Sequence, residues 1–232
     1  MKKITIAFLM LLGTFSMASA ELGVNIGVSG SIGEYKVNGF ESEGTERNSH
    51  TGETTIGALG SVFFEKSLNF LPGPFSRITV GYDMVTHEVN TGTQSRVDRD
   101  ILGISALSAN GTTLINERSK NTVSATLDNI NTMYVMAHLT SFLYIKAGLQ
   151  EMDITTTESL TSGSVYGNAS TEGTILAIGL EATTDAGIFM RLEVNNVEYD
   201  NVTIASSTNV DNTVTLNEFD GTAAKLSIGK TF

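Results

Sequence analysis

The stretch GTAAKLSIGKTF, residues 221–232, decides the fold of this chain. Ala224, Leu226 and Ile228 recur at every second position among small or polar residues, and Phe232 is the last residue. A period of two is typical of a β-strand with one apolar face. Chain ends fray unless something holds them, so an ordered strand that runs to the last residue predicts a partner strand for this segment.

The same alternation recurs in earlier parts of the sequence. The stretches are 22–37, 54–65, 75–86, 121–139, 142–150, 174–184 and 188–199. In 121–139 the apolar residues change parity, and a β-bulge near Asp128-Asn129 would bring them onto one face. With the C-terminal stretch, the sequence predicts eight strands.

The connections between these strands alternate in length. Those at about 38–53, 87–121, 155–172 and 200–219 are long and rich in Asn, Thr, Ser, Gly and acids, whereas the others are short. Long loops at one end and short turns at the other are typical of outer-membrane barrels. The predicted fold is therefore all-β, an eight-stranded antiparallel up-and-down transmembrane β-barrel.

The N-terminal segment predicts export. Residues 1–20 contain two lysines, an apolar run and the small-x-small site Ala18-Ser19-Ala20, the layout of a signal peptide. The remaining 21–232 would form the barrel domain, with 12 Lys and Arg against 25 Asp and Glu, a formal charge of −13. That charge argues against nucleic acid as a partner. The chain has no cysteine, so no disulfide supports the fold.

The polar faces of the predicted strands are small and carry balanced charges. Four are basic and four acidic: Glu65, Arg77, Asp83, Lys146, Glu181, Arg191, Glu193 and Lys225. A lone charge inside a narrow barrel is costly, so we expect these residues to form ion pairs in the lumen. If the sheet closes into a ring, every backbone amide and carbonyl in the hydrocarbon region has a hydrogen-bond partner, and the apolar face can contact lipid. Glycines on the polar face could leave a narrow water path beside the pairs: Gly27, Gly57, Gly81, Gly148 and Gly179.

Taken together, these features resemble the small eight-stranded outer-membrane barrels of Gram-negative bacteria, the opacity-type family and the transmembrane domain of outer membrane protein A. The resemblance implies the outer membrane, contacts with lipid and lipopolysaccharide, a monomer, and loops that meet surface ligands or phage. It also implies that the barrel-assembly machinery reads the C-terminal signal, here Leu226, Ile228, Gly229 and Phe232. Lys230 departs from the family pattern, which has an apolar or aromatic residue there, although a lysine near the rim can snorkel.

Catalytic and metal motifs are weak in this sequence. The stretch HLTS at 138–141, with Glu151 further on, is faintly similar to the His-x-Ser pattern of lipid A deacylases, but Thr140 stands where serine is needed. His50 and His87 have no evident partners, and acidic stretches such as 209–212 are too sparse for a calcium loop. We therefore expect no catalytic residue, metal or cofactor.

Two functions remain open, and a third is disfavoured. The first is a non-enzymatic envelope protein with interaction loops. The second is a small porin-like channel for passive diffusion of solutes, although eight strands leave an interior that side chains fill. A lipid A-modifying enzyme is disfavoured because its site is missing.

Overall fold

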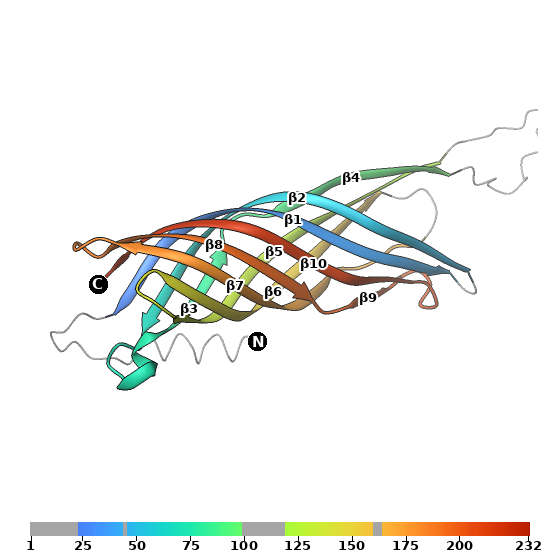
Figure 1. Ribbon diagram of the computed structural model, residues 1–232. Helices are drawn as coiled ribbons and strands as arrows, with labels where there is room; N and C mark the ends of the chain where they lie inside the picture. The colour runs from blue at the N-terminus through green and yellow to red at the C-terminus, as the bar shows by residue number, and fades with distance from the viewer. Residues whose placement is uncertain (1–22, 44–45, 99–118, 160–163) are drawn as a thin grey trace, which may run out of the picture.

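The computed structural model describes residues 23–43, 46–98, 119–159 and 164–232, and one antiparallel sheet dominates it (Figure 1). The predicted signal peptide, 1–20, lies outside the described residues. The strands are β1 (Val24–Glu43), β2 (Glu46–Ser67), β3 (Ile78–Val85), β4 (Val89–Asp98), β5 (Ser119–His138), β6 (Leu143–Ser159), β7 (Ala169–Thr183), β8 (Ile188–Tyr199), β9 (Val202–Ala205) and β10 (Thr213–Thr231). A short 3-10 helix, η1 (Gly73–Arg77), precedes β3. No helix among the described residues is long and apolar enough to cross a membrane.

Eight of these strands form a closed ring, as the sequence predicts. The order is β1-β2-β3-β5-β6-β7-β8-β10, and β10 pairs back onto β1, for example Val28 with Ile228. At the seam the Phe232 amide donates to the Val24 carbonyl at 2.9 Å. The terminal residue is therefore held by the first strand. The strands β4 and β9 lie off the ring and extend it beside β5 and β10.

One end of the barrel, which we call the turn end, holds the short connections and the C-terminus (Figure 1). Residues 139–142 and 184–187 join neighbouring strands there, and Gly187 takes the positive φ of 75° that its turn requires. The opposite end, the loop end, differs from expectation. Most of the predicted loops at 38–53, 155–172 and 200–219 are strand, while 99–118 lies outside the described residues.

The prediction of loops in these segments was wrong because a polar composition was taken as evidence against strands. The loop-end segments are rich in Thr, which favours strands, and they pair with neighbouring strands on either side of a few register shifts. Their low hydrophobicity shows only that these strand extensions do not face hydrocarbon. The barrel wall therefore continues well beyond the part with an apolar exterior.

The two faces of the wall show which side meets lipid. Along β8 the outward residues Ile188, Met190, Leu192 and Val194 are 45% to 55% exposed, while Arg191 and its inward neighbours are buried. A soluble barrel has the opposite arrangement, with apolar residues inside. The chain is therefore a membrane-spanning β-barrel.

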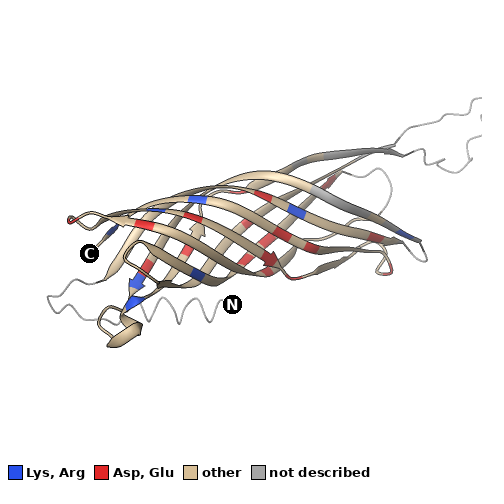
Figure 2. Cartoon of the chain, viewed as in Figure 1, with Lys and Arg blue, Asp and Glu red and all other residues tan. Residues whose placement is uncertain are grey.

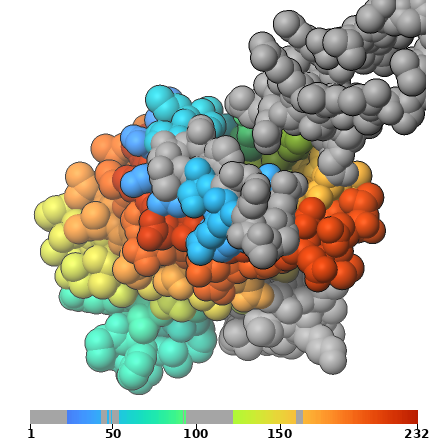
Figure 3. Space-filling view, turned by 90° about the vertical axis from the view of Figure 1, so that its right-hand side faces the viewer, coloured from blue at the N-terminus to red at the C-terminus, as the bar shows by residue number. Residues whose placement is uncertain are grey.

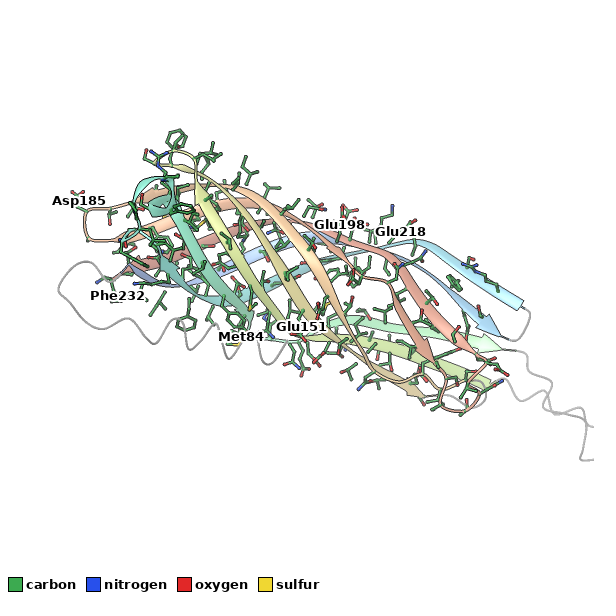
Figure 4. All side chains as sticks on the ribbon, turned by 90° about the horizontal axis from the view of Figure 1, so that it is seen from below. Met84, Glu151, Asp185, Glu198, Glu218 and Phe232 are labelled. Carbon is green, nitrogen blue, oxygen red and sulfur yellow. The ribbon has the colours of Figure 1, made fainter. Side chains whose placement is uncertain are left out.

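Carboxylates mark the loop-end limit of the apolar exterior. Going up β8, the outward positions change from Val194 to Asn196 and then Glu198. The segment from Ile188 through Glu198 is about eleven residues long, the length of a tilted strand that crosses a bilayer. Outward acids follow on other strands and form what we call the acidic belt: Glu34, Glu151, Glu172, Glu198 and Asp220. Figure 4 places Glu151 and Glu198 about halfway along the molecule, and Figure 2 shows acidic residues gathering from there toward the loop end.

The parity change in β5 has the predicted cause. Pairing with β6 shifts between Asp128 and Asn131, and Asn129 has a φ of 49°. The bulge brings Leu127 and Ile130 onto the same face, and that face is the interior. Inward apolar residues of β6, β7 and β8, such as Ile154, Ile175 and Val197, join the same cluster.

Candidate functional site: the charged interior

Arg191 lies at the centre of the charged interior. This β8 side chain donates to both oxygens of Glu65 on β2, at 2.5 and 2.9 Å, and its Nε donates to Glu181 on β7 at 2.6 Å. Glu65 is fully buried and accepts two further bonds, from Tyr134 at 2.7 Å and Asn25 at 2.9 Å. A buried ion pair is tolerated when the arginine binds the carboxylate with two hydrogen bonds and further donors satisfy the remaining carboxylate lone pairs.

Two further ion pairs lie beside this cluster. Lys146 on β6 donates to Glu193 on β8 at 2.5 Å, and the Tyr144 hydroxyl donates to the same carboxylate at 3.0 Å. Lys225 on β10 donates to Asp83 on β3 at 2.5 Å across the lumen. Together these four ion pairs connect β2, β3, β6, β7, β8 and β10 through the inside of the barrel.

Seven of the eight charged residues expected in the lumen meet there: Glu65, Asp83, Lys146, Glu181, Arg191, Glu193 and Lys225. Arg77 does not, and this corrects its placement. It ends η1 before β3 begins, is exposed, and donates to the Leu139 carbonyl at the turn end. Without it the interior has three bases and four carboxylates. His138 Nε2 also lies 3.6 Å from Glu181.

Aromatic rings occupy the space that glycines leave in the wall. A Cβ on Gly81 would lie 2.3 Å from the ring of Tyr134, and one on Gly179 would lie 2.3 Å from the ring of Tyr144. The nearest atoms to Gly27, Gly57 and Gly148 also belong to Phe63, Tyr35 or the β5 segment around Tyr134. The expected water path along these glycines is therefore wrong, because rings fill it.

The remaining space between the charged side chains is small. A cavity of about 10 Å³ lies beside Glu65 and Arg191, and one of about 40 Å³ lies above it, between Asp83, Lys146 and Thr132. One water needs about 10–15 Å³ of such space. The smaller cavity can hold one water and the larger about three, and neither has room for a larger solute.

The residues that complete the interior were missed at the sequence level. Phe63, Tyr144 and Phe189 share the parity of the interior charges in their strands, which was the available signal, whereas β5, which carries Tyr134, contributes none of those charges. The Arg191 guanidinium lies 4.3 Å from the Phe189 ring centroid, a cation–π contact. The aromatic rings and the ion pairs thus form one interlocked layer.

The expected assembly-signal residues lie at the turn end of β10. Leu226 and Ile228 are outward and about half exposed, Gly229 lies under the ring of Phe189, and Phe232 is exposed at the seam. Lys230 Nζ lies 5.2 Å from the Phe232 ring centroid, so the lysine that departs from the family pattern contacts the terminal aromatic. Recognition of this segment by assembly machinery stays a prediction.

The histidine segment does not form a nucleophile and base. The Thr140 hydroxyl accepts from the amides of Phe142 and Leu143, at 3.2 and 2.9 Å, so it stabilises the turn. Glu151 belongs to the acidic belt on the outside, and His87 is exposed, 3.3 Å from the Ala58 carbonyl. Among the described residues, no three His, Asp or Glu side chains gather as a metal site.

Comparison with known proteins finds similar shapes at low identity. No family model and no curated protein matches the chain. Among solved structures, the outer membrane protease OmpT from Escherichia coli is 6% identical, covers 95% of this chain and 100% of its own, and has a TM-score of 0.44. A Pseudomonas aeruginosa FadL homologue is 6% identical, with 90% of each chain covered and a TM-score of 0.35. The translocator domain of autotransporter NalP from Neisseria meningitidis is 10% identical, covers 100% of this chain and 96% of its own, and has a TM-score of 0.31. At TM-scores below 0.5 these similarities add nothing to the assignment of function.

Proposed function

We propose that this chain is a non-enzymatic integral protein of the outer membrane of a Gram-negative bacterium, a closed scaffold that presents an interaction surface at its loop end. The observation that carries the proposal is the interior layer of ion pairs and rings. Three charge pairs cross the lumen, and the space left beside them fits only a few waters. Such an interior holds a wall together and does not pass solutes.

The loop-end extension supports the second half of the proposal. At the level of the acidic belt, Ile154, Ile175, Val197 and Tyr199 form a buried apolar cluster, so the interior is packed where the extension begins. Figure 3 views this end and shows side chains of the β1–β2 hairpin beside those of the C-terminal segments. The whole chain has a net charge of −11, and the extension presents exposed carboxylates such as Asp211 and Glu218. Its partners would be surface ligands with complementary charge.

The experiment that tests the closed scaffold is conductance of refolded 21–232 in a planar bilayer, with insertion checked by heat-modifiable gel mobility. We expect a silent membrane, because the Arg191–Glu65 pair blocks the lumen. Stable conductance steps from the unaltered protein would overturn the proposal and favour a small porin-like channel.

A double variant, Arg191→Ala with Glu193→Ala, makes the test more specific. It removes one member of three ion pairs, and we expect it to open intermittent steps if it inserts. The exposed Arg77→Ala variant is the matched control and should stay silent. Equal conductance from both variants would mean that the interior layer is not the barrier.

A further inference from the structure

The barrel wall has an open seam at the loop end, between β2 and β4. Nearer the turn end β2 pairs with β3, and this pairing stops at Ser61 opposite Val85. Beyond that point β4 continues along β5, in the place that β3 occupies below, while β2 pairs only with β1 among the residues that the structure describes. Figure 1 shows β2 and β4 separating toward the loop end. The sheet therefore ends in two neighbouring strand edges.

The rest of the extension is connected from strand to strand. β1 pairs with β10, and β10 pairs with β9. The Ser207 amide donates to the Val165 carbonyl at 2.8 Å and Tyr166 forms a β-bridge with Ser206, so the segment after β8 is joined to the β6–β7 connection. β6 pairs with β5 in turn. The break between β2 and β4 is thus a local feature of the wall.

The open edge of β2 presents backbone groups at every second residue. The Gly60 carbonyl accepts from the Thr86 amide at 3.1 Å, and His87 Nε2 lies 3.3 Å from the Ala58 carbonyl, so both carbonyls point away from β1. Because backbone groups alternate along a strand of an antiparallel pair, the amides of Ala58 and Ile56 point the same way. Neither amide has a partner among the described residues. Thr86 and His87 therefore cap the start of the edge and leave it open above them.

This edge lacks the protection that edge strands usually have. Natural edge strands carry charges or proline, which stop another chain from pairing with them. Residues 54–60, TTIGALG, contain neither. Ile56 lies opposite Glu34 of the acidic belt, where the apolar exterior ends, and is 75% exposed. Open backbone groups beside an exposed β-branched side chain are the features that strand addition uses, since the backbone supplies affinity and the side chains supply specificity.

We propose that the β2 edge at residues 54–60 binds an extended segment of another protein as an added β-strand. This inference rests on the loop-end interaction surface proposed above and names the class of its partner. The segment has apolar residues in alternation, to cover Ile56, and basic residues at its ends, which the net charge of −11 favours.

A second copy in the same membrane does not fit this edge. Strands of a membrane barrel tilt by about 35–45°, so the β2 edges of two facing barrels would cross instead of lying side by side. An extended segment outside the membrane can align with the whole edge.

The test uses the synthetic peptide Lys-Thr-Val-Thr-Val-Thr-Val-Thr-Lys, whose alternating part is as long as 54–60. The control peptide has proline for the central valine and the same charge. Anisotropy of the labelled peptides measures binding to refolded 21–232 in micelles, and NMR measures amide exchange. We expect the valine peptide to bind about tenfold more tightly, because proline removes a donor from the strand. At saturation it should slow exchange of the Ile56 and Ala58 amides several-fold.

Two variants separate the backbone from the side chain. Ile56→Pro removes the open donor, and an edge strand accepts this change because the lost N–H pairs with no neighbouring strand. It should weaken binding of the valine peptide by about tenfold. Ile56→Ala keeps the N–H and should weaken binding clearly less. Heat-modifiable mobility checks that both variants fold, and the exchange measurement on the unaltered protein needs no variant.

Three results would overturn the proposal. Equal binding of the two peptides would mean that charge alone attracts them, and would leave the charged interaction surface intact. Absence of binding by the valine peptide would exclude strand addition. Slow exchange of the Ile56 and Ala58 amides before any peptide is added would mean that the edge is already covered, by a second copy where the protection rises with protein concentration. None of these results depends on whether the lumen conducts.

Discussion

The two halves of the barrel interior are held together in different ways. At the turn end, inside the membrane, charged residues and aromatic rings interlock across the lumen, as in the contact of Arg191 with Glu65 and Glu181. At the loop end, near and above the acidic belt, the interior is an apolar cluster around Met152 and Val197, and the wall is incomplete between β2 and β4.

The difference follows from what surrounds each half. Inside the bilayer the exterior must be apolar, so the polar residues of each strand can lie only in the lumen, where each charge needs a partner. Above the belt, water covers the outside, and the interior can then be apolar as in a soluble protein. Water also solvates unpaired edges, so the loop-end wall tolerates a missing strand pair.

Loss of Arg191 is expected to have the largest effect. Arg191→Ala would leave the buried Glu65 and Glu181 without their base, and breaking a buried pair from one side costs about 3–5 kcal/mol. Equilibrium unfolding in urea with reversible refolding into vesicles measures it. Arg77→Ala is the control, since Arg77 is exposed and its one bond goes to a rim carbonyl. Equal losses in the two variants would show that burial does not distinguish the two arginines.

These two arginines also show how far the sequence predicts the site. The period of two placed Arg191 and six other charges inside correctly, because in-out alternation is a property of any paired strand. The same pattern misplaced Arg77, because the alternation of inward and outward side chains was extended from β3 back into η1. In η1 the backbone is helical, so side chains no longer alternate between two faces. The eight strands and their closure were predicted for the same reason that the seven charges were.

The choice of partner was beyond the sequence. Lys225 and Asp83 are 142 positions apart and meet because of the stagger of the whole ring, which no single strand pattern contains. The aromatic filling was missed because ring positions depend on glycines in neighbouring strands, as with Tyr134 and Gly81. Loop-end strands were predicted as loops because the alternation of apolar residues in the sequence stops where the strands leave the hydrocarbon region.

A second prediction compares packing in the two halves. A Cβ on Gly179 would lie 2.3 Å from the Tyr144 ring at the turn end, whereas one on Gly57 would lie 3.3 Å from the Tyr35 ring nearer the loop end. Overpacking costs about 1–3 kcal/mol, so Gly179→Ala should lose stability within that range and Gly57→Ala clearly less. The same urea titration measures both. A larger loss for Gly57→Ala would reverse the comparison and make the loop-end half the tighter one.

The smallest effect is expected in the extension. The Tyr166 hydroxyl donates to Glu41 on β1 at 2.6 Å and so ties the β6–β7 connection to the first hairpin. Tyr166→Phe removes this hydrogen bond and keeps the ring, so we expect it to destabilise the extension by about 1 kcal/mol. The loss should act on local opening of the extension, because the membrane-embedded half unfolds separately from fluctuations at the rim. Hydrogen exchange of the upper β1 amides should accelerate several-fold while the urea midpoint stays unchanged. If the midpoint shifted together with the exchange rates, the two halves would unfold as one unit, and the division between a locked membrane half and an independently opening loop-end half would have to be abandoned.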